Sequence, residues 1–395
     1  MGHVEKLPNG RSKARYRIPG GRERSKTFKR KKDADVYLAR AEADISRGIW
    51  RDPSSGRITY AEWASQYLES SVHKRATTLA RDHQVNDKHL APALGGIPLA
   101  SISRLDVQRL VNSMNTKLQP ATVRTNYGVL RAILNAAVLA DVLAQSPCVG
   151  VKLPPKSPSN VPFIDATQIM ELADYMPSEY RCAVLLGGVL GLRWSEVAGL
   201  RVGRINFLRE TLEVVETLSE VNGKLLIADP KSPASRRVMS VPSFLIIELS
   251  RHLKRRGRPE QGEYVFTMPE GGPLRRANFN RRYFQPAVKA AGLTGVTFHV
   301  LRHSAAGVMI DQGAHVKQIQ QRLGHSSVST TMDVYGHVLA ATDGDLNRAL
   351  EEAFSVSRGQ TAATGTDNAS AQARNPLRGL VEVMGLEPTT STLRT

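Results

Sequence analysis

The sequence predicts a multidomain protein with a small β-sheet plus helix N-terminal module, an all-α domain, and a mixed α+β domain that is mainly helical. Its 395 residues exceed what one hydrophobic core normally organises. Near the N-terminus, basic and apolar residues alternate as they do in strands. A proline-rich stretch further along separates a purely helical pattern from one in which strands and helices are mixed.

Residues 1–55 form the first predicted unit. Apolar Ala14 and Tyr16 alternate with basic residues, and the Pro-Gly-Gly of residues 19–21 is typical of a turn between strands. The stretch 33–47 then places apolar residues at helical spacing. We therefore expect a little sheet braced by one helix. The alternative is a basic arm without a fold, because runs of charge are often simply solvated.

Residues 57–145 form a helical domain. Two capping-box patterns open predicted helices, namely Thr59 with Glu62 and Ser103 with Asp106. A third helix is expected to begin near Pro120, where apolar residues recur every three or four positions. These apolar stripes are interpreted as core rather than as a binding face.

Prolines and lysines dominate residues 146–162, which we expect to be an extended linker. The mixed domain follows over residues 163–355. It should contain a helix at 178–190 and strands near 211–217, 224–227 and 238–241. Residues 356–395 are rich in small and polar types and are expected to form a poorly ordered tail.

The charge balance favours a polyanionic partner. Lys and Arg number 54 against 36 Asp and Glu, a formal net charge of +18, and the pI is near 10.1. Residues 11–32 hold eleven basic residues and one acid, which predicts a contact surface. The candidate contacts in this segment are Arg11, Lys13, Arg15, Arg17, Arg22, Arg24 and Lys26.

The sequence also predicts where the protein resides. Its longest apolar stretch, residues 183–192, is too short to span a bilayer, so we expect no membrane partner. No apolar run adjoins the N-terminal charges, as a secretory signal would require. The distant Cys148 and Cys182 make no disulfide framework. We therefore expect a soluble protein in a reducing cytoplasm.

Four short segments of the mixed domain stand out in this order along the chain. They are Gly191-Leu192-Arg193-Trp194-Ser195-Glu196, Pro230-Lys231-Ser232, His299-Val300-Leu301-Arg302-His303, and Leu323-Gly324-His325 followed by Tyr335. Together they resemble the catalytic signature of the tyrosine recombinases, or phage integrases. The resemblance makes residues 163–355 a catalytic domain. It likens residues 57–145 to the family's core-site-binding domain and residues 1–55 to its arm-type DNA-binding module.

Two arginines suit phosphodiester chemistry without any resemblance. Attack on a phosphodiester builds charge on its oxygens, and fixed guanidinium groups stabilise that charge and can hold two oxygens at once. Arg193 follows an apolar run that would anchor its backbone. The alternative is a surface arginine paired with Glu196. Arg302 lies three residues after His299, so a helix would present both on one face.

The resemblance gives these residues roles. It makes Arg193 and Arg302 the two catalytic arginines and His299 the histidine that assists proton transfer from the nucleophile. His303 falls outside the set and is interpreted as a packing or capping histidine. A zinc site at His299 and His303 is disfavoured because the Glu of H-E-x-x-H is missing. We expect no metal.

The remaining catalytic positions are Lys231, His325 and Tyr335. A lysine near other cations has a lowered pKa and can give up a proton, and the resemblance makes Lys231 the general acid for the 5′ oxygen. Other cations lie nearby in the sequence, so the match of Lys231 to the family's lysine is left open. They are Lys224, Arg236 and Arg237. By resemblance, His325 bonds a phosphate oxygen and Tyr335 is the nucleophile.

The family's mechanism implies a site-specific recombinase that cleaves and rejoins DNA through a 3′-phosphotyrosyl intermediate. It would integrate, and in reverse excise, a mobile element such as a prophage. The resemblance implies double-stranded DNA with core-type and arm-type sites, a homotetramer on DNA, and no cofactor. A bacterial host DNA-bending protein and an excision factor are further partners that it allows. The alternatives are a type IB topoisomerase and a non-enzymatic DNA-binding regulator.

Overall fold

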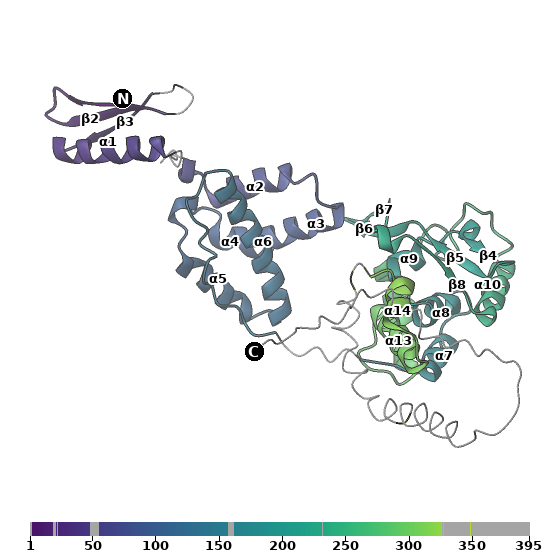
Figure 1. Ribbon diagram of the computed structural model, residues 1–395. Helices are drawn as coiled ribbons and strands as arrows, with labels where there is room; N and C mark the ends of the chain where they lie inside the picture. The colour runs from purple at the N-terminus through teal and green to yellow at the C-terminus, as the bar shows by residue number, and fades with distance from the viewer. Residues whose placement is uncertain are drawn as a thin grey trace, which may run out of the picture. The chain divides into compact units, whose positions relative to one another are not determined.

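The computed structural model describes residues 2–18, 21, 23–47, 55–156, 162–230, 232–325, 327 and 348. Their buried apolar side chains gather in three clusters, one in each of the segments 2–47, 55–156 and 162–325. The multidomain architecture expected from the length is therefore confirmed. Each segment is described by itself below (Figure 1).

The first segment is a sheet covered on one face by a helix (Figure 1). Its strands β1 (His3–Lys6), β2 (Ser12–Arg17) and β3 (Glu23–Phe28) are antiparallel in the order β1-β2-β3. Helix α1 (Lys31–Ser46) packs its small and apolar residues against Ala14 and Tyr16 of β2. The predicted sheet and helix are both present, and β1 is an addition that the sequence pattern did not reveal.

The second segment is helical. It contains α2 (Tyr60–Ser70), α3 (Ala76–Val85), α4 (Ala91–Leu94), α5 (Arg104–Asn115) and α6 (Pro120–Leu139), with a π-helical turn η2 (Asn86–Leu90) and short 3-10 turns η1 (Ser55–Arg57) and η3 (Leu99–Ser101). Both predicted capping boxes are formed, at Thr59 and at Ser103, and α6 begins at Pro120 as predicted.

The third segment mixes helices with short antiparallel strands. Its helices are α7 (Ala166–Asp174), α8 (Arg181–Val189), α9 (Trp194–Ala198), α10 (Ser243–Arg255), α11 (Arg276–Phe279), α12 (Gln285–Ala290), α13 (Phe298–Asp311) and α14 (Val316–Leu323). One sheet has the order β4 (Ile205–Asn206), β5 (Thr211–Val214), β8 (Arg237–Ser240), and β6 (Thr217–Val221) pairs with β7 (Lys224–Ala228). The 3-10 turns are η4 (Val202–Arg204) and η5 (Pro233–Ser235), and η6 (Asn280–Phe284) is a π-helical turn.

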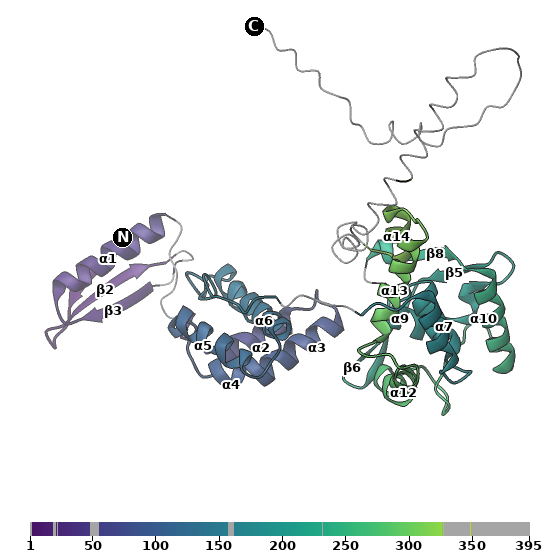
Figure 2. The same ribbon diagram turned by 90° about the horizontal axis from the view of Figure 1, so that it is seen from below.

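Helix α8 is central to this segment. It is buried along most of its length and packs against α7, α10 and α13, which lie around it in Figure 1. Figure 2 shows α7, α10 and α13 from below. The mainly helical α+β prediction is therefore confirmed. No helix of the described ranges is both long enough and apolar enough to cross a membrane.

Two predicted boundaries are wrong. The strand expected near 211–217 is two strands, because β5 pairs with β8 whereas β6, which starts at Thr217, pairs with β7. The helix expected from Ser178 begins at Arg181, because the amides of Tyr180 and Arg181 both bond the Pro177 carbonyl in a turn.

Candidate active site

Arg193 is the N-cap residue of α9. The chain reaches it through Gly191, whose φ of +71° favours glycine and whose Cα lies so close to Leu323 that a Cβ would overlap that side chain. Trp194 then packs against Phe298 with ring centroids 5.3 Å apart. This contact joins the start of α9 to the start of α13, so the residues beside each aromatic ring, Arg193 and His299, belong to one site.

The ion pair considered as an alternative for Arg193 is present, but its carboxylate is not on the surface. Arg193 Nη1 lies 2.8 Å from Glu196 Oε1, and the Arg193 amide donates to Glu196 Oε2 over 2.9 Å. The Glu196 side chain is 1% exposed and that of Arg193 is 32% exposed. These bonds orient the guanidinium and leave it partly exposed. Toward the described residues, two of its five N–H donors are used, one by Glu196 and one by the Gly324 carbonyl.

Arg302 lies deeper, on the buried face of α13, and is 2% exposed. Its Nη1 donates to the Gly191 carbonyl and its Nη2 to the Leu323 carbonyl, each over 2.6 Å. Arg302 therefore bonds the loop before Arg193 on one side and the end of α14 on the other. Burial lowers the pKa of His299, His303 and His325, and the charge of Arg302 lowers it further.

The end of α14 brings His325 to the arginines. Gly324 caps this helix in the left-handed conformation, with φ +66°. Arg193 Nη2 donates to the Gly324 carbonyl over 3.3 Å, one residue after the carbonyl that Arg302 bonds. The His325 amide and carbonyl are both bonded to Gln320, by its carbonyl and its side chain respectively. The two residues before His325 thus hold both arginines.

The predicted helix through His299, Arg302 and His303 is confirmed as α13. The His299 and His303 rings meet edge to face, with centroids 4.6 Å apart. Desolvation, then His303, then nearby arginines lower the pKa of His299 to about 4. Desolvation, then Arg302 and Arg193, lower the pKa of His325 to about 4 as well. Both rings are therefore neutral at pH 7.

Two predicted catalytic residues, Lys231 and Tyr335, lie outside the described residues. The other predicted catalytic residues, Arg193, His299, Arg302 and His325, are brought together by the structure. Within the described ranges, no cluster of three or more His, Cys, Asp or Glu side chains could hold a metal ion.

The predicted DNA contacts in the strands of the first segment lie on two different faces of its sheet. Residues paired directly in an antiparallel sheet point to the same face. Lys13, Arg15 and Arg17 alternate with the buried Ala14 and Tyr16 and so lie on the face away from α1. Within this face Arg15 is held by Glu5 and Glu23, at 3.0 and 2.9 Å.

Lys26 and Arg24 pair with Ala14 and Tyr16 and therefore lie on the α1 side. The Lys26 ammonium lies 4.9 Å from the ring centroid of Tyr37, a residue of α1. Arg11 is exposed in the turn before β2, and Arg22 is outside the described residues.

Two residues of the site were not predicted as functional. The sequence suggests Glu196 only as a surface partner of Arg193, and Arg237 only as a competitor for the position of Lys231. In the structure, Arg237 donates to both carboxylate oxygens of Glu196 at 3.2 and 3.0 Å. The sequence signal for Glu196 was its position, three residues after Arg193 and shortly after an apolar run.

Three family models match the chain. The phage integrase family matches residues 162–342, the phage integrase N-terminal domain matches residues 1–47, and the phage integrase N-terminal SAM-like domain matches residues 59–115.

Relatives match along nearly the whole chain. A putative prophage phiRv2 integrase of Mycobacterium tuberculosis is 27% identical over 363 residues, covering 89% of this chain and 95% of that protein. A tyrosine recombinase XerC-like protein of Caldanaerobacter subterraneus is 24% identical over 387 residues, covering 88% of this chain and 98% of that protein.

Solved structures share the fold. The Tn1549 transposon integrase in complex with transposon right end DNA matches with a TM-score of 0.64 and 20% identity, covering 75% of this chain and all of that one. A lambda integrase tetramer bound to a Holliday junction matches with a TM-score of 0.54 and 20% identity, covering 82% of this chain and 95% of that one. The family models and the named relatives agree, and the chain therefore belongs to the phage integrase family of tyrosine recombinases.

Proposed function

We propose that this site-specific DNA recombinase cleaves and rejoins DNA through an ester between Tyr335 and a DNA phosphate. The observation that carries this proposal is the attachment of Arg193 and Arg302 to the Gly324 and Leu323 carbonyls, directly before His325. Two fixed guanidinium groups and two neutral imidazoles at one place suit a phosphodiester, whose attack builds negative charge on the phosphate oxygens.

The chemistry balances without an added reagent. The Tyr335 phenolic oxygen bonds phosphorus, the bond from phosphorus to the 5′ oxygen breaks, and a 3′-phosphotyrosyl ester and a 5′ hydroxyl result. A 5′ hydroxyl of the partner duplex then attacks the ester and regenerates the phenol. The energy of the broken phosphodiester is kept in the ester, so no step needs ATP or a metal ion.

His299 and Lys231 are proposed to move the protons. A phenol is mostly protonated at pH 7 and needs a base to become a nucleophile. His299 is neutral at that pH because its pKa is about 4, so it can accept the phenolic proton, and a bound phosphate would favour its charged form. Lys231 would donate a proton to the departing 5′ oxygen.

Double-stranded DNA is the partner of this recombinase, and we propose that different segments hold different sites. Residues 57–145 would bind core-type DNA, and residues 1–55 would bind arm-type DNA through the face of the sheet that carries Lys13, Arg15 and Arg17. A linker at 146–162 would join these segments to a catalytic domain at 163–355, with a tail at 356–395.

We further propose that four copies act together on two duplexes, because each exchange cuts four strands. The lambda integrase tetramer on a Holliday junction supports this proposal. The mycobacterial relative, named a putative prophage integrase, supports integration of a prophage. We propose that the same chemistry in reverse excises it, and that both reactions take place in the bacterial cytoplasm. A host DNA-bending protein and an excision factor would set the direction.

The type IB topoisomerase and the DNA-binding regulator are not favoured, because the named relatives are integrases and recombinases. A nicked core-site duplex tests the proposal, since its cleavage releases a short strand and traps the ester. The full chain should form a covalent complex on this duplex and should join two intact duplexes, whereas Tyr335→Phe should bind DNA and form no covalent complex. Tyr175→Phe, at an exposed tyrosine, is the matched control. A covalent complex formed by Tyr335→Phe would overturn the nucleophile.

A further inference from the structure

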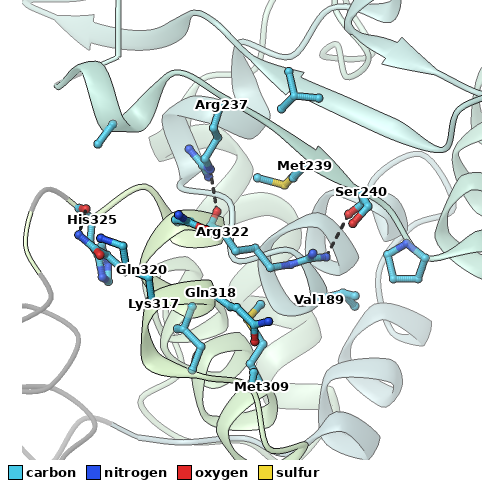
Figure 3. Close-up of a pocket in the computed structure, with 16 residues that line it drawn as sticks. Val189, Arg237, Met239, Ser240, Met309, Lys317, Gln318, Gln320, Arg322 and His325 are labelled. Carbon is cyan, nitrogen blue, oxygen red and sulfur yellow. Dashed lines mark hydrogen bonds between the residues drawn. The ribbon is translucent and has the colours of Figure 1, made fainter. Parts of the chain in front are cut away.

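Arg237 is the first residue of β8, and its side chain is only 7% exposed. Its Nε donates to the Arg322 carbonyl over 2.7 Å, and its Nη1 donates to the Ser235 carbonyl over 3.0 Å. Figure 3 shows the guanidinium reaching the Arg322 carbonyl at the edge of a pocket of about 880 Å³. Such a buried arginine is costly unless its donors are satisfied, and this one is bonded on several sides.

The most important acceptor of Arg237 is Glu196. Its two carboxylate oxygens receive Nη1 and Nη2 of Arg237, at 3.2 and 3.0 Å, while they also hold the side chain and amide of Arg193. One buried negative charge is thus shared between two guanidinium groups. Because Arg237 takes part of that charge, Arg193 keeps more of its positive potential than it would in a simple pair with Glu196.

Arg237 also fixes the backbone that leads to His325. The guanidinium approaches Gly324 so closely that a Cβ there would lie 3.1 Å from Arg237 Nη1. A second bond runs in the opposite direction, from Arg322 Nη2 to the Ser240 carbonyl at the end of β8 (Figure 3). The end of α14 is therefore bonded to both ends of β8.

We propose that Arg237 is a positioning residue for DNA cleavage, which orients Arg193 through Glu196 and holds the Leu323–His325 backbone through Arg322. This inference rests on the proposed function of Arg193 and His325 at the phosphate. All the acceptors of Arg237 named above are protein groups, so its effect on the phosphate passes through other residues.

A purely structural role is the competing explanation. Removing one member of a buried ion pair leaves the other unpaired and lowers stability. A general loss of folded protein would lower cleavage of every substrate in the same proportion. A misplaced Arg193 would instead affect most the substrate that needs positive charge most.

A methylphosphonate linkage separates the two explanations. It replaces one charged phosphate oxygen with a methyl group, so the uncharged linkage depends less on the arginines. Single-turnover ester formation should be measured with excess protein on two nicked core-site duplexes, one with a phosphate and one with a methylphosphonate. The variants are Arg237→Met and Arg237→Lys, and Arg251→Met removes an exposed arginine that pairs with a glutamate on α10 as the control.

We expect Arg237→Met to lower cleavage of the phosphate by about ten- to a hundredfold, as for other residues that orient functional side chains. Cleavage of the methylphosphonate should fall clearly less, and core-site affinity should be nearly unchanged. Arg237→Lys, which keeps the charge but not the two-pronged contact, should fall between wild type and Arg237→Met. An equal loss on both substrates, or normal cleavage of the phosphate, would overturn the inference.

A spectroscopic measurement without DNA tests the contact between Arg237 and Arg193 even if a variant binds DNA poorly or the chain forms no ester. In DNA-free protein labelled on arginine, the Arg193 Nε–H signal, identified by its loss in Arg193→Lys, should move in Arg237→Met and stay in Arg251→Met. An unmoved signal would contradict the contact through Glu196. Absence of the ester in the wild-type chain would contradict the proposed function instead.

Discussion

Arg193 and Arg302 are attached to consecutive carbonyls of one strip of backbone, those of Gly324 and Leu323. One guanidinium comes from the N-terminus of α9 and the other from the second turn of α13, so neither helix alone defines the site. Their charges are close enough to lower the pKa of His325. The strip therefore fixes the relative positions of three groups that the proposed chemistry needs at one phosphate.

The first prediction concerns these two arginines. Arg193→Lys and Arg302→Lys should each lower single-turnover cleavage by about a hundredfold, because a lysine cannot reproduce the fixed donors that stabilise charge in the transition state. Arg302→Lys should also lower the melting temperature, because it leaves buried carbonyls without a donor. Arg251→Lys, at an exposed position, should change neither quantity. Near-normal cleavage in either site variant would mean that the phosphate is held elsewhere.

The second prediction concerns pH. The pKa values of His299 and His325 fall from 6.5 to about 4 on folding, so between these values the unfolded chain binds more protons than the folded one. The stability that the neutral rings contribute is fully present above pH 6.5 and is lost as the pH falls towards 4. Urea unfolding of the DNA-free protein should therefore show a free energy that declines across this window.

His299→Gln should make this decline shallower, because a glutamine does not titrate. His73→Gln, at an exposed histidine between α2 and α3, is the matched control and should keep the wild-type slope. Equal slopes in wild type and His299→Gln would show that burial and the neighbouring histidine and arginines do not hold this ring neutral.

The third prediction compares two glycines with positive φ at the ends of helices. Gly292, with φ +69°, has open space where a Cβ would stand, whereas at Gly324 a Cβ would lie 3.0 Å from the Ala234 carbonyl and 3.1 Å from Arg237 Nη1. Gly292→Ala should cost about 1–2 kcal/mol from backbone conformation alone. Gly324→Ala should cost more and should also slow cleavage, because it pushes η5 and Arg237 away. Equal losses of stability in denaturant titrations would contradict the close approach.

Much of the fold was predictable because its signals are local. The capping boxes at Thr59 and Ser103 each lie within four residues, so the sequence alone contains both partners. The spacing of His299 and Arg302 likewise needed only one helix, and α13 supplies it. The four segments that resemble the family's catalytic signature could also be recognised from the sequence, because each is contiguous in the chain.

The role of Arg237 was not predictable, because it depends on contacts between distant segments. Arg236 and Arg237 are identical neighbours, yet their side chains are 63% and 7% exposed. Only the placement of β8 against α14 and α9 separates them. Similarly, the basic residues of β2 and β3 alternate with the same period, and the register between the strands decides which face each occupies.

The last prediction uses that register. Lys13 lies on the face of the sheet away from α1, and Lys26 lies on the α1 side beside Tyr37, so the two lysines differ in placement but not in charge. If the free face binds arm-type DNA, Lys13→Gln should weaken that binding and reduce its log–log salt slope by about 0.9, the value for one phosphate contact. Arg17→Gln should act alike, while Lys26→Gln should leave the slope unchanged. All three proteins should still form the Tyr335 ester on core-site DNA, because Arg193, Arg302 and Tyr335 all lie in residues 163–355. Equal effects of Lys13→Gln and Lys26→Gln would mean that net charge, rather than this face, carries the binding.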